Sequence, residues 1–149
     1  MARSPNILLV EDDPNDALLV TKAFQKTLGG IPLHIVANGQ EAVSYLKGEA
    51  QYADRARHPF PDIVLLDLKM PMMNGFEVLR WIRGQPKLKR LPVIVLTGSV
   101  QDSDARLAYE IGANSYVIKP TDFNRLMETM KILGSFWLGG TKLPEAEPQ

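Results

Sequence analysis

Residues that could carry metal or phosphate chemistry follow four apolar runs of this sequence, at the points where the runs end. ILLV is followed by Glu11, Asp12 and Asp13, IVLL by Asp67, VIVL by Thr97 and Gly98, and YVI by Lys119 and Pro120. If these runs are parallel strands, their carboxyl ends share one edge of the sheet, and these residues meet there. Clustered carboxylates suit a hard divalent cation, whereas an ammonium and a hydroxyl suit phosphoryl oxygens. The pattern predicts a site for metal and phosphate.

Length and composition favour one compact domain. The chain has 149 residues, of which 45% are hydrophobic and 23% are charged, so it can bury a normal core. The 17 basic and 17 acidic residues balance, and no overall field favours nucleic acid or an anionic membrane. The absence of cysteine from the sequence excludes disulfides and thiolate chemistry. No apolar run resembles a signal peptide or reaches membrane-spanning length, so a cytoplasmic protein is expected.

Strand and helix patterns alternate along the chain. The strands are expected at 6–10, 33–37, 62–67, 93–97 and 115–119. Asp13 and Pro14 predict a cap and first residue of a helix that ends near Gly29, and Asn38 precedes a short second helix. The segment 48–61 reads as a long polar loop.

Three further helices are predicted in the second half of the chain. One carries Phe76, Leu79 and Ile82, and the next spans about 102–111 and ends at Gly112 as a left-handed cap. The last has apolar residues at spacings of three and four: Phe123, Leu126, Met130, Leu133 and Trp137. Five alternations of strand and helix predict an α/β fold with a doubly wound parallel sheet.

Five ordered signatures resemble a known family. They are Glu11-Asp12, Asp67, Met70-Pro71 with Gly75, Thr97-Gly98 and Lys119-Pro120. From Ile7 to about Trp137, the chain resembles the receiver domain of bacterial two-component response regulators, which act in phosphorelays. The resemblance implies the flavodoxin-like receiver fold, with five strands in the order 2-1-3-4-5 and five helices. It also implies one receiver domain over residues 1–149, with a core of about 6–137 and a tail of 138–149.

Asp67 is the expected phosphorylation site. A carboxylate can attack phosphorus and form an aspartyl phosphate, and in this family the donor is a phosphohistidine of a sensor histidine kinase. The resemblance implies Mg²⁺ as cofactor, with Asp12 and Asp67 as direct ligands, the backbone carbonyl of Lys69 as another, and Glu11 acting through water. Asp13 is instead expected to cap the first helix.

Lys119, Thr97 and Gly98 are expected to hold the phosphoryl group. The ammonium of Lys119 stabilises its charge, the Thr97 hydroxyl donates to it, and Gly98 leaves room for a close approach. By resemblance, the bond from Lys119 to Pro120 is cis, and Thr97 and Tyr116 form a conformational switch. Strict alternation places Tyr116 and Lys119 on opposite faces of the sheet.

The output is expected to come from the receiver surface. The long loop, AYEIGANSYVIKP and LGSFWL are most similar to single-domain regulators paired with cyanobacterial and bacterial phytochromes. A histidine kinase of the phytochrome type is therefore an expected partner, and direct nucleic-acid binding is not expected. In that group the terminal region supports dimers, so a homodimer through Tyr116, Met130, Leu133 and Trp137 is a further expectation. The alternative is a last helix that packs only on its own sheet.

Other functional classes fit the residues less well. Phosphatases of the haloacid-dehalogenase type place a second Asp two positions after the nucleophile, where this chain has Lys69. A flavin module needs a phosphate-binding loop after the first strand, and Glu11, Asp12 and Asp13 would repel that phosphate. A passive phosphate sink and a pseudo-receiver that never takes phosphate remain as alternatives. The protein is thus expected not to be an enzyme beyond its own phosphotransfer and dephosphorylation.

Overall fold

A single parallel sheet organises the protein. The computed structural model describes residues 5–140 and 142–144. Its five-stranded sheet has the order β2-β1-β3-β4-β5, which confirms the order implied by the family resemblance. The strands are β1 (Ile7–Val10), β2 (Leu33–Val36), β3 (Ile63–Leu66), β4 (Val93–Thr97) and β5 (Ser115–Ile118). Every neighbouring pair is parallel.

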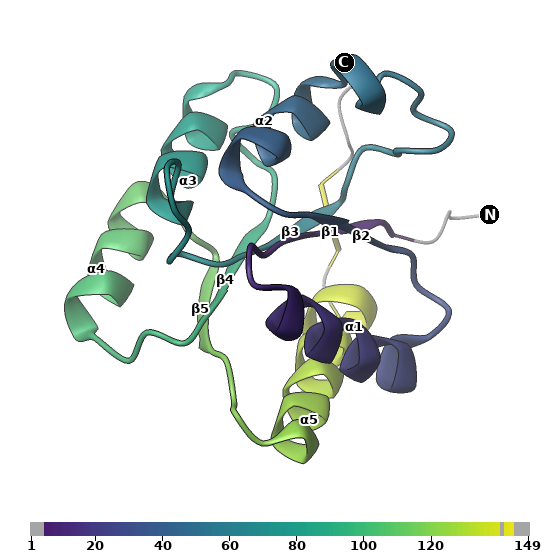
Figure 1. Ribbon diagram of the computed structural model, residues 1–149, viewed down its shortest axis with the longest axis vertical. Coiled ribbons are helices and arrows are strands. Elements are labelled where there is room, and N and C mark those ends of the chain that lie inside the picture. The colour runs from purple at the N-terminus through teal and green to yellow at the C-terminus, as the bar shows by residue number, and fades with distance from the viewer. Residues whose placement is uncertain (1–4, 141, 145–149) are drawn as a thin grey trace.

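Helices cover both faces of the sheet (Figure 1). On one face lie α1 (Pro14–Leu28) and α5 (Phe123–Leu133), which pack against each other. On the other lie α2 (Gly39–Lys47), α3 (Gly75–Gly84) and α4 (Asp102–Ile111). The protein is therefore a three-layer α/β structure, as the alternating sequence pattern predicts.

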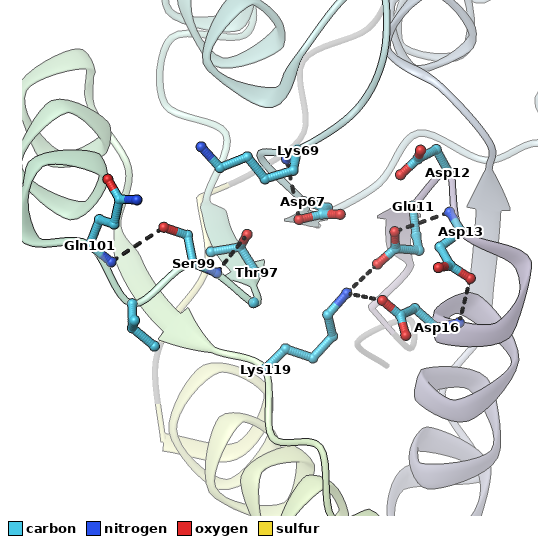
Figure 2. Close-up of a pocket in the computed structure, with 12 residues that line it drawn as sticks. Glu11, Asp12, Asp13, Asp16, Asp67, Lys69, Thr97, Ser99, Gln101 and Lys119 are labelled. Carbon is cyan, nitrogen blue, oxygen red and sulfur yellow. Dashed lines mark hydrogen bonds and ion pairs between the residues drawn. The ribbon is translucent and has the colours of Figure 1, made fainter.

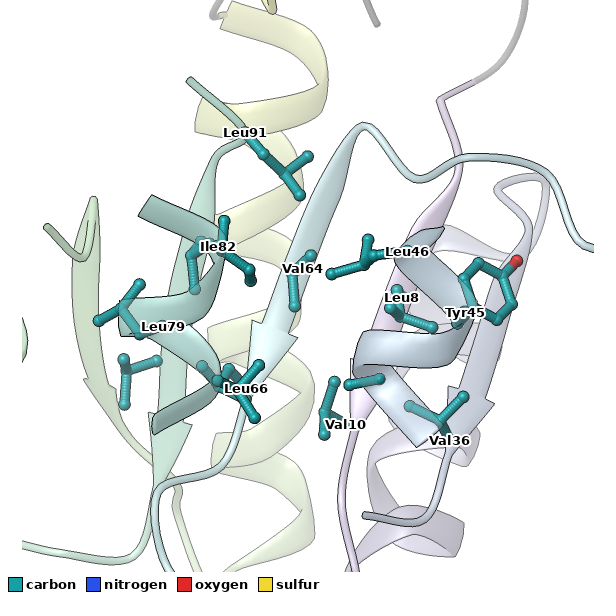
Figure 3. Close-up of a cluster of buried hydrophobic side chains, with 14 of the residues drawn as sticks. Leu8, Val10, Val36, Tyr45, Leu46, Val64, Leu66, Leu79, Ile82 and Leu91 are labelled. Carbon is teal, nitrogen blue, oxygen red and sulfur yellow. The ribbon is translucent and has the colours of Figure 1, made fainter. Parts of the chain in front are cut away.

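The central strands are buried on both faces because each contributes alternate residues to two cores. Val10 and Leu66 belong to the core beneath α2 and α3 (Figure 3), whereas Leu9 and Leu65 belong to the core beneath α1 and α5. The register aligns Val10 with Leu66, and Leu66 with Val95. The residues that follow these positions therefore emerge together at the carboxyl edge of the sheet.

Side-chain caps fix where the helices next to that edge begin. Asp13 Oδ1 accepts hydrogen bonds from the backbone N–H groups of Asn15 at 2.8 Å and Asp16 at 3.3 Å, which confirms its predicted role. Asn38 caps α2, and Asn74 forms a capping box with Glu77 at the start of α3. Each cap satisfies backbone donors that have no partner inside the helix.

The end of the last helix differs from the sequence prediction. The α-helix ends at Leu133, and Gly134–Gly140 continues as a π-helix, although Trp137 still packs against the same core as Leu126 and Met130. At Gly134 a Cβ would lie 2.5 Å from a methyl carbon of Leu28. A side chain at this position would force the Leu28 side chain to move, so the close contact between α1 and this segment favours glycine there. Leu126 and Met130 are buried in the core beneath α1.

Two backbone expectations also need correction. The described chain contains no cis peptide bond, so the bond between Lys119 and Pro120 is trans rather than cis. Gly112 ends α4 with φ +130°, a positive value that favours glycine but lies outside the predicted left-handed helical region.

The long loop after α2 is tied to that helix. It contains the short 3₁₀ helix η1 (Ala50–Tyr52). The Arg55 guanidinium donates to the backbone oxygens of Tyr45 at 2.7 Å and Leu46 at 2.9 Å, which satisfies carbonyls at the end of α2.

Within the described part of the chain, no helix is both long and apolar enough to cross a membrane.

Candidate functional site

The carboxyl ends of β1, β3, β4 and β5 open onto one pocket of about 540 Å³ (Figure 2). It is lined by Glu11, Asp12, Asp13, Asp16, Asp67, Lys69, Thr97, Gly98, Ser99, Val100, Gln101 and Lys119. The structure thus brings together every site residue predicted from the strand ends. Tyr116 is the predicted switch residue that does not line it.

Three carboxylates at this edge form a candidate metal site. One oxygen from each of Glu11, Asp12 and Asp67 lies within 4.8 Å of the oxygens of the other two. Oxygens bound to one Mg²⁺ at about 2.1 Å lie at most about 4.2 Å apart. The trio therefore needs only a small closing movement to hold such an ion. Lys69 also lines the pocket, where its backbone carbonyl is the remaining expected ligand.

Two of these acids are buried next to each other. Glu11 is 3% exposed and Asp67 is 7% exposed. Burial raises the pKa of Glu11 to about 7, and the Asp67 charge adds to this rise, although the Lys119 hydrogen bond opposes it. Asp67 Oδ1 accepts a long hydrogen bond of 3.5 Å from the backbone N–H of Lys69. Two adjacent buried carboxylates are costly when both are ionised, and a cation between them relieves that cost.

Lys119 reaches into the pocket from the end of β5. Its Nζ donates to Glu11 Oε1 at 2.6 Å and to Asp16 Oδ2 at 2.9 Å. Burial opposes the charge of the ammonium, but its two hydrogen bonds and the neighbouring carboxylate charges outweigh burial and raise its pKa above the ordinary value. Lys119 is thus a fixed cation beside Asp67.

Thr97 and Gly98 close the pocket on the side of β4. Thr97 is fully buried, and its Oγ1 accepts a hydrogen bond of 3.4 Å from the backbone N–H of Ser99. A Cβ at Gly98 would meet nothing within 4 Å. Packing therefore does not require glycine at this position, and its small size leaves room in the pocket.

Gly75 holds the loop after β3 against the strand. A Cβ at this position would lie 2.2 Å from the backbone oxygen of Asp67 and 2.8 Å from Leu68 Cα. Only glycine fits, because both neighbours are backbone atoms that cannot turn aside. This contact explains why glycine in the Met70-Pro71 signature matters for the position of Asp67.

Asp104 joins two residues of the pocket rim and was not predicted from the sequence. Its Oδ2 accepts a hydrogen bond from Ser99 Oγ at 2.6 Å and forms an ion pair with Lys69 Nζ at 3.0 Å. The Ser99 hydrogen bond, together with Lys69, lowers the pKa of Asp104. Its place in the first turn of α4, directly after the Thr97 strand, is the sequence signal that could have identified it.

Asp16 is the second residue that sequence reasoning missed. It lies in the first turn of α1, three residues after the Asp13 cap, and its side chain turns towards Lys119 (Figure 2). The spacing from Asp13 places it one helical turn from the strand end, which is the signal that was available.

Tyr116 faces away from Lys119, as strand alternation predicts. It packs against the core beneath α2 and α3, and its hydroxyl donates to the backbone oxygen of Ser99 at 3.1 Å. Ser99 follows Thr97 by two residues. Tyr116 is therefore linked to the Thr97 loop from the opposite face of β5.

Comparison with known proteins decides the family. Residues 7–131 match the response regulator receiver domain. The chain belongs to this family. Receiver domains are signalling modules of two-component systems, and this chain keeps each of the five signatures at the pocket or beside it.

Two relatives match nearly the whole chain. FilR2 of Methanothrix harundinacea, named a probable methanogenesis regulatory protein, is 37% identical and covers 93% of this chain and 86% of its own length. The response regulator Rcp1 of Synechocystis is 36% identical over 94% of this chain and 93% of its length.

Solved structures of such relatives have the same fold. The phosphorylated cyanobacterial phytochrome response regulator RcpA is 35% identical, with a TM-score of 0.88, and covers 96% of this chain and all of its own. The Mn²⁺-bound form of Rcp1 is 35% identical, with a TM-score of 0.83, over 95% of this chain and 99% of its own.

Proposed function

We propose that this protein is a response regulator that accepts a phosphoryl group on Asp67 from a phosphohistidine of a sensor histidine kinase. The observation that carries the proposal is the position of Asp67: a buried carboxylate at the end of β3, in the same pocket as Lys119 and Thr97. An Asp67 oxygen attacks phosphorus, an O–P bond forms, and the P–N bond to the donor breaks with its electron pair on the histidine.

The other pocket residues supply binding and charge in this step. Lys119 would place its ammonium against one phosphoryl oxygen, and the Thr97 hydroxyl would donate to another. Glu11, Asp12, Asp67 and the Lys69 carbonyl would hold Mg²⁺, which when bound neutralises phosphoryl charge. The carboxylate trio within 4.8 Å supports this metal set, and Rcp1 binds the similar ion Mn²⁺.

The expected partner is a histidine kinase coupled to a phytochrome. Rcp1 and RcpA support this choice because RcpA is a phytochrome response regulator and both align with almost all of this chain. Beyond the family match, Leu133, Trp137, Leu138 and Leu143 pack against the core beneath α1 and α5, which supports a single receiver domain. We further propose that the protein signals through its surface, by kinase docking or homodimer formation, without direct nucleic-acid contact.

Asp67→Asn tests the phosphoacceptor. The purified protein is incubated with Mg²⁺ and phosphoramidate, a small donor with the P–N bond of phosphohistidine, and the phosphoryl adduct is measured by intact mass spectrometry. The wild type should form the adduct and Asp67→Asn should form none, because its amide cannot attack. Asp122→Asn is a matched control outside the pocket, since Asp122 caps α5 and asparagine caps equally well. An undiminished adduct on Asp67→Asn would overturn the assignment.

A further inference from the structure

Lys119 is held between two carboxylates that differ in their relation to the metal site. Glu11 belongs to the trio of close carboxylate oxygens, whereas Asp16, among the described residues, does not. The ammonium nevertheless contacts both, at 2.6 Å and 2.9 Å (Figure 2). One partner of Lys119 would thus be needed for metal binding, and the other is free of that role.

The position of Asp16 is set by the start of α1. The Asp13 cap fixes the first turn, and the Asp16 backbone N–H is one of its two donors. The Asp16 side chain is 42% exposed, whereas those of Lys119 and Glu11 are 10% and 2% exposed. Asp16 therefore contacts the ammonium from the mouth of the pocket, and Glu11 contacts it from the floor.

We propose that Asp16 is a positioning residue for Lys119: it holds the ammonium at the mouth of the pocket while Asp67 is unphosphorylated and yields it to the phosphoryl group afterwards. This role rests on the proposed function. In the unphosphorylated protein a cation entering the trio repels the ammonium, and Asp16 offers it a partner that does not compete for metal. In the phosphorylated protein the phosphoryl oxygens compete with Asp16 for Lys119.

Removal of the Asp16 charge should therefore change two affinities in opposite directions: the affinity of the unphosphorylated protein for Mg²⁺ and its affinity for a mimic of the phosphoryl group. Without Asp16, the ammonium depends on Glu11 and competes more strongly with Mg²⁺, so Mg²⁺ binds more weakly. The phosphoryl group no longer competes with Asp16 for the ammonium, so a phosphoryl mimic binds more tightly. Both changes require Lys119, which separates this role from a general effect of charge.

The test compares Asp16→Asn with Asp13→Asn. Both variants remove one carboxylate from the pocket lining, but only Asp16 contacts Lys119, and asparagine keeps the Asp13 cap. Calorimetry measures the affinity for Mg²⁺, and then for beryllofluoride at saturating Mg²⁺. Coupling energies between contacting groups predict that Asp16→Asn weakens Mg²⁺ binding and tightens beryllofluoride binding by roughly threefold to tenfold. Asp13→Asn should shift either affinity by less than about twofold. Asp16→Glu keeps the carboxylate and should bind both ligands with wild-type affinity.

The Lys119→Met background tests whether Asp16 affects Mg²⁺ binding through Lys119. In this background Asp16→Asn and Asp13→Asn should shift Mg²⁺ affinity equally, and thermal unfolding checks that all variants fold. Equal effects of the two variants when Lys119 is present would overturn the inference, as would an Asp16 effect that persists without Lys119. Failure of wild-type protein to form an adduct with phosphoramidate would instead overturn the proposed function, because Mg²⁺ affinities do not depend on that reaction.

Discussion

At the scale of single residues, the pocket combines acids that repel each other with one lysine that cannot neutralise them all. Glu11 and Asp67 are buried side by side, and Lys119 contacts Glu11 directly. Burial of like charges favours a bound proton when no cation is present. The repulsion between these carboxylates therefore lowers the stability of the folded protein when no metal is bound. Sites that bind a charged ligand commonly carry such a cost.

This arrangement predicts a pH dependence of stability in metal-free protein. The pKa of Glu11 rises from 4.5 to about 7 on folding, so between these values the folded state binds more protons than the unfolded state. The free energy of unfolding should then fall as pH rises, by on the order of 1 kcal/mol between pH 6 and pH 8 from this group. Urea unfolding in the presence of a chelator measures it.

Glu11→Gln is the matched variant, because it removes the titrating group and keeps its size. The decline from pH 6 to pH 8 should be smaller in the variant than in the wild type. The burial-lowered pKa of His34 affects both proteins alike and cancels in the comparison. Equal slopes in the two proteins would show that Glu11 does not titrate in this range.

The sequence predicted the strand-end residues of the site but not those on the helices. Asp67 and Thr97 directly follow apolar strands, and the parallel sheet forces such positions to one edge. Asp16 and Asp104 lie in polar stretches at the starts of helices. Their direction depends on helix register and tilt, which the apolar pattern of a short first turn does not determine.

At the scale of elements, Arg83 ties α3 to the loops that precede β4 and β5. Its guanidinium donates to the backbone oxygens of Gly112 at 2.9 Å, Lys89 at 3.1 Å and Leu91 at 2.7 Å, and to Asn114 Oδ1 at 2.9 Å. Asn114 Oδ1 also accepts from the backbone N–H of Val93 at 2.8 Å. One side chain thus supports the starts of both β4 and β5, whose far ends carry Thr97 and Lys119.

Arg83→Ala should therefore destabilise the protein by roughly 2–3 kcal/mol, because several partly buried acceptors lose their donor at once. Arg83→Lys should recover only part of this loss, since an ammonium cannot reproduce the planar fork. Arg80→Ala, at an exposed position of the same helix, should change stability by less than about 0.5 kcal/mol. Denaturant unfolding provides the values, and similar losses for both alanine variants would contradict the role of Arg83.

Helix starts were predictable and one helix end was not. Asp13, Asn38 and Asn74 cap helices through local hydrogen bonds that depend only on adjacent residues. The change from α-helix to π-helix at Gly134 accompanies tight packing against Leu28, more than a hundred residues away. The trans bond before Pro120 likewise departs from what the family resemblance implied, although Lys119 still points into the pocket.

At the scale of the whole molecule, the structure changes which residues are available for self-association. Met130 was expected on a dimer surface, but it is 1% exposed and packs in the core beneath α1. That expectation was wrong, because the apolar stripe of α5 is used for packing on its own sheet. Ile132 and Phe136 are instead exposed apolar side chains of this region, at 69% and 59%.

We expect phosphorylation to change self-association or kinase docking through this exposed surface. Sedimentation with and without beryllofluoride and Mg²⁺ should show a higher average mass in the activated protein, because Tyr116 links the Thr97 loop to the face of β5. Ile132→Glu should weaken the association by roughly tenfold or more, since a buried unpaired charge costs more than about 1.4 kcal/mol. Leu18→Glu, at an exposed position of α1, serves as the control and should leave it unchanged. Equal mass and equal kinase affinity in the two states would contradict output through the surface and favour a passive phosphate sink.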